Sequence, residues 1–369
     1  MRGLPVPAVA LLLAGCATVQ GGGLTAPAAP ATAPLASMPP AMMLPAKDVA
    51  ARAETDPVGT ALADAADDPA IWRNPANPAA SLIVGTDKKA GLYSYGLDGR
   101  KRSFVSAGQL NNVDLRDAVL WAGKRVILVG ASDRTDRARP RVSLFTLDGA
   151  SGALSQIGSF DSGTAGEAYG FCFGRHRGGM PTAYVVTKAG VVLELALSDD
   201  PARPMTLLRQ FGVTTQAEGC VVDDRTGQLY LGEEDVGIWR FDLNAVQPVA
   251  IPFAGVGAAQ GLVADVEGLA LAPVGDKAGD KGGLLVVSSQ GDNGYALLDL
   301  TDGTLRGRFR INGGAIGGTS DTDGIELALG DFGPDYPAGL FVAQDGDNLP
   351  RAQNFKLVSW ADVKGALGL

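Results

Sequence analysis

The sequence contains very few of the residues that bind transition metals. Its 369 residues include one His and three Cys. Zinc and most transition-metal sites are built from these two side chains, so their scarcity argues against such a site. The same scarcity leaves no credible Cys/His or Ser/His nucleophile system. A covalent enzyme intermediate at a nucleophile of that kind is therefore not expected.

Charged residues are also scarce, and they are unevenly balanced. They make up 19% of the chain, and the formal net charge is -9. An acidic balance argues against nucleic acid and against anionic membrane surfaces as partners. An anionic substrate would fit only if bound cations inverted the local field. Glycine is abundant, with 51 residues, and 46% of residues are hydrophobic, which favours many short strands and tight turns over a helical bundle.

Long apolar runs are lacking except at the N-terminus. Arg2 precedes an apolar run over residues 4–14, which is too short to span a bilayer as a permanent helix. The run ends in "LAGC", which resembles the bacterial lipobox, so Cys16 is the expected lipidation site. The alternative is an ordinary signal peptide with an incidental Cys. Either way we predict export, to the outer membrane or periplasm or into the medium, with a lipid anchor as the only membrane contact.

The chain divides into three predicted parts. Residues 1–16 form the signal peptide, and residues 17–50 are rich in Ala, Pro, Gly and Thr, which is typical of a disordered tether. Residues 51–369 form the folded domain. Its two cysteines, Cys172 and Cys220, could form one disulfide in an exported protein. Both lie in apolar strand-like runs, however, which favours two buried free thiols.

The folded domain shows a repeating unit of an apolar strand, a polar cluster, a second strand and a turn. The repeats align on Val84, Val129, Val186, Leu231, Val287 and Val342. Units of this length that are mostly strand predict a six-bladed β-propeller, an all-β fold. Helix signals are scarce. The clearest is "SWADVKGAL" at the end, where Ser359 and Asp362 resemble a capping box.

Several Glu residues lie inside apolar runs rather than in turns. They are Glu218 in "TQAEGC", Glu234 in "LGEEDVGIW" and Glu267 in "ADVEGLA". Glu is not a turn former, and a buried carboxylate requires a cation or hydrogen-bond donors. Loops of all blades meet on one face of a propeller, so these oxygens are expected at one channel mouth. Oxygen ligands suit Ca²⁺, and several carboxylates predict more than one ion.

Basic residues occur at matching places in three consecutive repeats. Lys88, Arg134 and Lys188 follow apolar strands, and Lys89 follows Lys88. Beside bound Ca²⁺ they would form a positive pocket that fits phosphate, because Arg offers a planar fork and Lys a compact charge. The alternative is that each basic residue pairs with a neighbouring acid. If the phosphate interpretation holds, Asp67 and Lys88 must lie at the same end of the propeller.

The order and content of these motifs resemble the β-propeller phytases. The motifs run from about residue 54 to residue 360 and include "DDPAIW", "KKAGL", "NNVDLR", "GASDR", "EAYGF", "EGCVVDDRTGQLYLGEEDVGIW", "DVEGL", "SSQGDN", "GTSDTDGI" and "VAQDGDN". The resemblance implies a Ca²⁺-dependent enzyme of the 3-phytase type. Such an enzyme hydrolyses phytate (myo-inositol hexakisphosphate) to lower inositol phosphates and phosphate with a metal-activated water. We expect it to act as a monomer.

The resemblance also implies roles for individual residues. The implied ligands of a catalytic calcium cluster are Asp67, Glu218, Glu234, Asp265, Glu267 and Asp323. The implied phosphate-binding residues are Lys88, Lys89, Arg134, Tyr169 and Lys188; all but Lys89 are also implied to be catalytic, together with Glu218 and Glu234. Asp68, Asn112 and Gln290 are implied to hold channel or structural ions. The sequence departs from the family at Gly317, where many members have Asp, and at Asp347, where they have Glu, which puts a peripheral structural calcium in doubt.

Two other functions share some of these features. A calcium-dependent propeller lactonase would have the same architecture and carboxylates, but it has no use for four basic residues at the channel mouth. A calcium-binding surface module without catalysis would need the carboxylates alone. Phosphate release from phytate, with and without a calcium chelator, separates the three.

Overall fold

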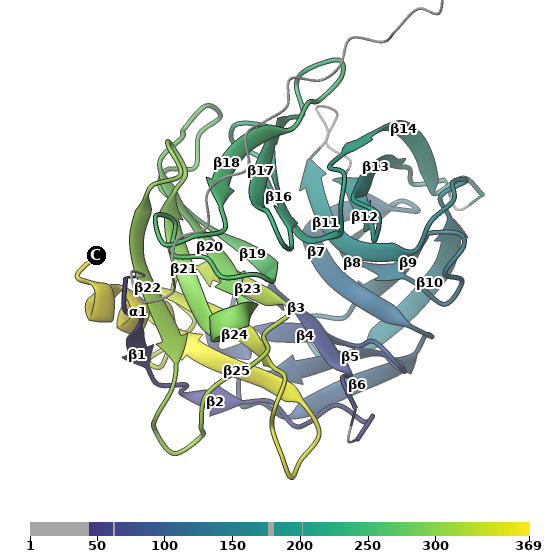
Figure 1. Ribbon diagram of the computed structural model, residues 1–369. Coiled ribbons are helices and arrows are strands. Elements are labelled where there is room, and N and C mark those ends of the chain that lie inside the picture. The colour runs from purple at the N-terminus through teal and green to yellow at the C-terminus, as the bar shows by residue number, and fades with distance from the viewer. Residues whose placement is uncertain (1–43, 62, 176–180, 201) are drawn as a thin grey trace, which may run out of the picture. The chain divides into compact units, whose positions relative to one another are not determined.

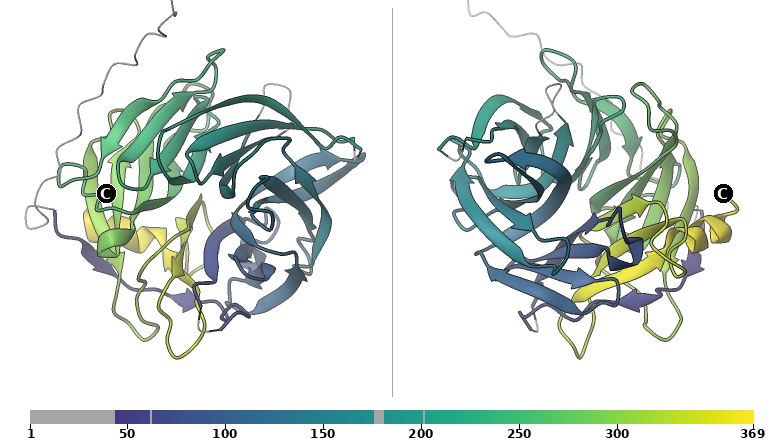
Figure 2. Two further views of the ribbon diagram at one scale, coloured as in Figure 1. Left: turned by 45° about the vertical axis from the view of Figure 1, so that its right-hand side comes forward. Right: turned by 180° about the vertical axis from the view of Figure 1, so that it is seen from behind.

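The computed structural model describes residues 44–369, apart from residues 62, 176–180 and 201 (Figure 1). Its strands form six sheets arranged in a ring, which confirms the predicted six-bladed β-propeller. Figure 2 shows the same ring from two further sides. No helix in this part of the chain is long and apolar enough to cross a bilayer. Cys16 and residues 17–43 lie outside the described residues, so what was predicted for them stays a prediction.

The strands of each blade follow one another in sequence from the channel outward. Blade 1 holds β3 (Ala66–Trp72), β4 (Leu82–Asp87), β5 (Gly91–Gly96) and β6 (Lys101–Ser106). Blade 2 holds β7 (Leu110–Trp121), β8 (Lys124–Asp133), β9 (Arg141–Leu147) and β10 (Leu154–Asp161). Blade 3 holds β11 (Ala168–Arg175), β12 (Pro181–Thr187), β13 (Val191–Leu197) and β14 (Met205–Gly212).

The second half of the ring repeats this order. Blade 4 holds β15 (Ala217–Asp223), β16 (Gln228–Glu233), β17 (Gly237–Asp242) and β18 (Ile251–Gly255). Blade 5 holds β19 (Val266–Pro273), β20 (Gly283–Ser289), β21 (Gly294–Asp299) and β22 (Leu305–Ile311). Blade 6 holds β23 (Ile325–Leu329), β24 (Gly339–Asp345) and β25 (Asn354–Ser359). The helical elements of the described chain are two 3₁₀ turns, η2 (Pro78–Ala80) and η3 (Gln290–Asp292), and the helix α1 (Trp360–Leu367).

Two short strands from the start of the described chain join the last blades (Figure 2). The strand β2 (Ala53–Glu54) pairs with β25 and supplies the outer strand of blade 6. The strand β1 (Lys47–Val49) pairs in parallel with β22 of blade 5, where Val49 is buried in a cluster that includes Phe309 and Ile311. The folded part therefore includes a few residues that the sequence assigned to the tether (17–50).

The core lies between blades rather than within one sheet. Six apolar clusters fill the spaces between neighbouring blades. Because both faces of a blade are covered, β3, β4 and β12 are buried along their whole length. This explains why the repeats show continuous apolar runs instead of strict alternation.

Cys172 and Cys220 form a disulfide, so the interpretation as two free thiols is wrong. The bond joins the inner strands β11 and β15 of neighbouring blades, with a Cα–Cα distance of 5.8 Å. The two residues are 48 positions apart, which is about one repeat, and they occupy similar places in adjacent blades. An apolar strand pattern indicates that a cysteine is buried. It does not indicate whether a second cysteine lies opposite it in the neighbouring blade.

The predicted terminal helix is confirmed, but its predicted cap is not. Ser359 is the N-cap residue of α1, yet its side chain makes no capping hydrogen bond. Asp362, the expected partner in the capping box, instead binds Arg52 with a distance of 2.7 Å between its Oδ2 and the arginine Nε. The carboxylate thus ties α1 to the segment before β2, which the local sequence pattern does not reveal.

A buried lysine connects the beginning and the end of the folded chain in blade 6. The Lys356 ammonium lies 2.6 Å from Glu54 Oε2 and 3.0 Å from Asp345 Oδ2. It also donates to the side-chain oxygens of Asn348 and Asn354. The Lys356 side chain is 1% exposed. One ammonium therefore neutralises carboxylates from β2 and β24, two segments at opposite ends of the folded chain.

We expect Lys356→Met to destabilise the protein by about 3–5 kcal/mol, because it removes the cation from the buried Asp345 carboxylate and leaves Glu54 only its pair with the more exposed Arg351. Chemical denaturation measures the change. Arg52→Met is the control, because its pair with Asp362 is more than a third exposed and should contribute about 1 kcal/mol or less. Equal, small losses for the two variants would contradict the role given to Lys356.

Candidate active site

The predicted site residues gather at one end of the channel, where most inner strands have a register shift near their starts. Register shifts interrupt five of these strands near their starts, at Ala66/Pro69, Leu110/Val113, Ala168/Gly170, Ala217/Cys220 and Val266/Leu269. The residues inside the shifts include Asp67, Asp68, Asn112, Tyr169, Glu218 and Glu267. A bulge of this kind bends a strand and re-aims its side chains. The polar residues thus interrupt the apolar strands where the backbone leaves regular pairing.

Three buried glutamates form the centre of the site. Carboxylate oxygens of Glu218, Glu234 and Glu267 lie within 4.8 Å of one another. Glu218 and Glu267 come from the inner strands β15 and β19, and Glu234 directly follows β16. The structure therefore brings together three of the predicted calcium ligands from two neighbouring blades.

Lys88 lies against a second group of carboxylates. Its ammonium is 2.9 Å from Asp67 Oδ1, 2.8 Å from Asp323 Oδ2 and 2.8 Å from Asp64 Oδ1. Burial opposes the charge on Lys88, but Asp67, Asp323 and Asp64 together raise its pKa above the usual value. Asp67 and Lys88 thus lie at the same end of the propeller, as predicted. The direct ion pairs also match the alternative, in which each basic residue pairs with an acid.

The carboxylates of the site carry more negative charge than their surroundings neutralise. Burial raises the pKa of Glu218 and Glu267 well above the usual value, and neighbouring carboxylates raise it further. Burial and the charge of Asp67 raise the pKa of Asp323 to about 8. A raised pKa marks a carboxylate whose ionised form a further cation would stabilise.

The donor atoms fit a hard cation such as Ca²⁺. Asp67 Oδ2 and Glu267 Oε2 are buried and have no hydrogen-bond partner. Gln290 lies nearby and donates to Asp323 at 2.7 Å, while Gln216 donates to Glu234 at 2.8 Å. Neither His nor Cys occurs among the described residues that line the pocket at these carboxylates. Buried carboxylate oxygens without donors, among carboxamides, are the chemistry of a calcium site.

A basic and aromatic group borders the glutamates. The Tyr169 ring contacts two cations, with the Arg134 guanidinium carbon 5.5 Å and the Lys188 ammonium 4.9 Å from its centre. Arg134 and Lys188 directly follow β8 and β12, as the repeats predicted. Arg134 donates to Asn111 at 2.6 Å, and Asn111 donates to Glu218 at the same distance. Burial and the charge of Glu218 raise the pKa of Tyr169, so its hydroxyl remains a donor.

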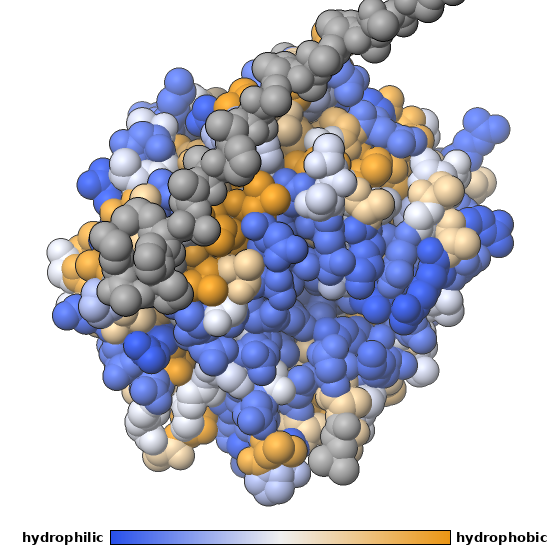
Figure 3. Space-filling view, viewed as in Figure 1, coloured by the Kyte–Doolittle hydropathy of each residue, from blue (hydrophilic) through white to orange (hydrophobic). Residues whose placement is uncertain are grey.

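A pocket of about 370 Å³ opens beside these groups. Its lining includes seven predicted residues, Lys88, Tyr169, Glu234, Asp265, Glu267, Gln290 and Asp323. It also includes residues that the sequence did not single out as site residues, namely Asp64, Gln216, Asp321 and Gln353. Asp64 lies just before "DDPAIW", and proximity to that motif was the only signal available. Figure 3 shows hydrophilic side chains gathered across the middle of the face seen in Figure 1.

Seven predicted residues are not part of this lining. Four of them, Asp67, Glu218, Arg134 and Lys188, lie next to residues that are. The other three are Asp68, Asn112 and Lys89. Asp68 and Asn112 line a separate small cavity along the channel, where Asp68 Oδ2 accepts a hydrogen bond of 2.9 Å from the Val113 amide. The Lys89 side chain is exposed and does not belong to the pocket lining. Lys88 and Lys89 share the turn that follows β4, and within this turn only Lys88 reaches the carboxylates of the site.

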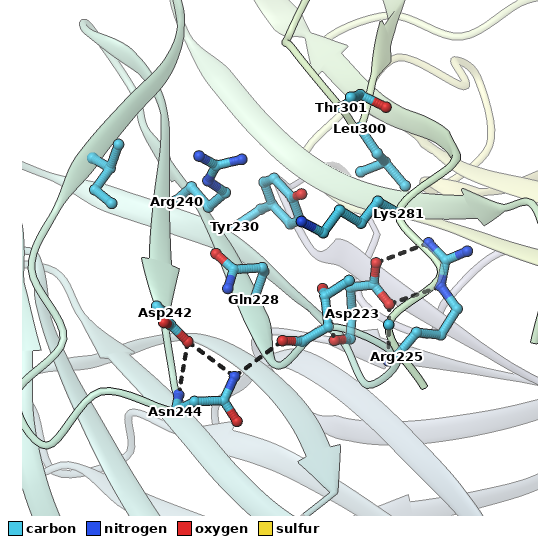
Figure 4. Close-up of a pocket in the computed structure, with 13 residues that line it drawn as sticks. Asp223, Arg225, Gln228, Tyr230, Arg240, Asp242, Asn244, Lys281, Leu300 and Thr301 are labelled. Carbon is cyan, nitrogen blue, oxygen red and sulfur yellow. Dashed lines mark hydrogen bonds and ion pairs between the residues drawn. The ribbon is translucent and has the colours of Figure 1, made fainter. Parts of the chain in front are cut away.

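A larger cleft of about 610 Å³ lies elsewhere, between blades 4 and 5 (Figure 4). Its lining includes Gln228 at the start of β16, whereas Glu234 follows the end of that strand. One of its cations, Arg225, is bound by Asp223 at 2.8 Å. This cleft therefore belongs to the opposite end of the blade and is not part of the site.

Comparison with known proteins gives sequence matches that cover most of the chain. The family described as Phytase matches residues 21–369. The 3-phytase of Bacillus subtilis (strain 168) is 39% identical over 337 residues, which are 87% of this chain and 85% of that protein. Among solved structures, a chain of the mitotic checkpoint complex aligns over 92% of this chain and 86% of its own length. Its TM-score is 0.47 and its identity 12%.

Proposed function

This chain belongs to the phytase family, and we propose that it hydrolyses phytate with Ca²⁺ ions held by the buried carboxylates at the channel mouth. The observation that supports the use of a cation is the cluster of Glu218, Glu234 and Glu267, with buried carboxylate oxygens that have no donor. The activity is that of a 3-phytase, the activity named for the relative from Bacillus subtilis.

The residues that would hold the ions are the carboxylates of the two groups described above. They are Asp67, Glu218, Glu234, Asp265, Glu267 and Asp323, with Gln290 beside them. Bound Ca²⁺ would lower the pKa of a coordinated water and offset the negative charge of the phosphoryl group. Asp68 and Asn112 line the separate cavity along the channel, and we propose that any ion they hold is structural.

The basic residues would bind and orient the phosphate group. Arg134 and Lys188 approach from the side of Tyr169, and Lys88 approaches from the side of Asp67 and Asp323. Cations on several sides can contact the equatorial oxygens, where charge develops during phosphoryl transfer. The protonated Tyr169 hydroxyl can donate a further hydrogen bond. Lys89, exposed beside the pocket, is a candidate contact for a second phosphate of the substrate.

Phosphate release from phytate tests the proposal. We expect release in the presence of Ca²⁺, loss of release in excess chelator, and recovery when Ca²⁺ is returned. A lactone substrate is the matched control, because a propeller lactonase would share the calcium requirement. Calcium binding without release of phosphate would support the non-catalytic module, and release that persists in chelator would contradict the role of calcium.

We also propose that the mature chain is exported as a monomer and anchored through a lipid on Cys16. The support is the lipobox-like "LAGC" at the end of the apolar run. Cells grown with a labelled fatty acid should yield a labelled protein, and Cys16→Ala should abolish the label. Labelling that survives this change would contradict the assignment.

A further inference from the structure

Four consecutive inner strands carry a glycine directly after a residue of the site. These glycines are Gly170 in β11, Gly219 in β15, Gly268 in β19 and Gly324 just before β23. They follow Tyr169, Glu218, Glu267 and Asp323 in that order. None of the four has a positive φ, so backbone conformation does not require glycine at these positions.

Space explains the glycines instead. A Cβ atom at Gly170 would lie 1.9 Å from the carbonyl oxygen of Glu218, which is the site residue of the next blade. The same contact recurs around the ring. The distances are 2.2 Å from Gly219 to Glu267 O, 2.7 Å from Gly268 to Asp323 O, and 2.7 Å from Gly324 to Asp67 O. Real Cβ atoms essentially never come closer than 3.0 Å, so any other residue would push the two inner strands apart.

Two of these contacts are also hydrogen bonds. The Gly268 amide donates to Asp323 O at 2.8 Å, and the Gly324 amide donates to Asp67 O at 3.0 Å. The next junction of the ring, between β3 and β7, lacks such a glycine and uses a side chain, because the Val113 amide donates to Asp68 Oδ2. The close backbone contacts thus occur where site residues of neighbouring blades must meet.

We propose that Gly170, Gly219, Gly268 and Gly324 are positioning residues that set the spacing of the carboxylates for Ca²⁺. This inference rests on the proposed function. Calcium binds oxygen at about 2.3–2.6 Å, so carboxylates that share an ion must lie within a few ångströms of each other. The carboxylate oxygens of Glu218, Glu234 and Glu267 lie within 4.8 Å of one another. The donor-free atoms Asp67 Oδ2 and Glu267 Oε2 belong to residues whose carbonyls two of these glycines approach.

Three alanine variants test the proposal at graded distances. Gly268→Ala places a Cβ 2.7 Å from Asp323 O. Gly232→Ala is milder, because its Cβ would lie 3.1 Å from Val266 O and 3.4 Å from Glu267 O. Gly174→Ala is the matched control. It lies on the same strand as Gly170, and its nearest neighbours are the Val222 and Tyr184 side chains at 2.9 and 3.1 Å.

The readouts are direct calcium binding by calorimetry without phytate, the calcium concentration for half-maximal hydrolysis, and the denaturation midpoint in chelator. We expect calcium affinity to fall about tenfold or more in Gly268→Ala, and by a smaller factor in Gly232→Ala. Gly174→Ala should lose stability but keep its calcium affinity.

Wild-type calcium affinity in folded Gly268→Ala and Gly232→Ala would overturn the inference, and so would an equal loss in Gly174→Ala. If Gly268→Ala does not fold, Gly232→Ala decides alone. A wild-type protein that binds no calcium would overturn the proposed function together with this inference.

Discussion

Glu267→Gln is expected to remove most calcium-dependent phytate hydrolysis while making the calcium-free protein more stable. Glu267 is 5% exposed, its Oε2 has no donor, and it lies within 4.8 Å of two other glutamates. Gln keeps the shape of the side chain but supplies one neutral oxygen ligand in place of a charged one. We expect kcat/KM for phytate at low calcium to fall about 100-fold or more.

The opposite change in stability follows from the same charges. In chelator, the wild-type cluster holds carboxylates whose pKa is raised by burial and by one another. Removing one of these charges relieves repulsion in the folded state, so denaturation of the variant in chelator should require more denaturant than the wild type does.

The control for Glu267→Gln is Asp302→Asn, a change in an exposed turn between β21 and β22. This variant should leave both activity and stability close to wild type. Activity of Glu267→Gln equal to wild type at low calcium would contradict the ligand role. Destabilisation of Glu267→Gln in chelator would contradict the assignment of uncompensated charge.

Lys88→Met is expected to lower kcat/KM for phytate by about 100-fold without weakening calcium binding. The Lys88 ammonium contacts Asp64, Asp67 and Asp323, two of which are proposed calcium ligands. An ammonium repels a nearby divalent cation and competes for the same carboxylates. Removing it should therefore leave calcium affinity unchanged or make it tighter, while one phosphate contact is lost.

Calorimetry with calcium and steady-state kinetics with phytate separate these effects. Lys124→Met is the matched control, because Lys124 is an exposed lysine at the start of β8, a site with no role in the pocket. If Lys88→Met loses calcium affinity along with activity, Lys88 supports the carboxylates rather than the phosphate. Wild-type kinetics in Lys88→Met would remove Lys88 from the site altogether.

The repeats made the fold predictable, and the strand ends made much of the site predictable. Lys88, Arg134, Lys188 and Glu234 each directly follow the second strand of a blade. Equivalent positions in a closed ring of blades meet at one end. Residues at matching positions in the repeats could therefore be predicted to lie close together. Prediction was poorer where adjacent residues had to be separated. Lys88 and Lys89 look alike in the sequence and lie in one turn after β4, but only Lys88 contacts the carboxylates, while Lys89 is exposed.

Contacts between residues that are distant in the sequence could not be predicted either. The disulfide between Cys172 and Cys220, the ion pair of Lys356 with Glu54, and the pairing of Arg52 with Asp362 all join residues from different blades or from opposite ends of the folded chain. Composition and periodicity describe the environment of each residue separately. They give no information about the distance between two particular side chains.

The sequence by itself determined the class of chemistry. The sequence has few His and Cys residues, has Glu inside apolar runs, and has basic residues at strand ends. Together these features favour oxygen ligands, a hard cation and a phosphate substrate, because they depend on the residue types themselves. The tertiary structure alone decided the spacing. Bulges in the inner strands and glycines at the blade junctions bring three glutamates within 4.8 Å of one another and place Lys88 against Asp67. Spacing depends on how closely neighbouring blades pack, and packing is a property of the closed ring rather than of any one repeat.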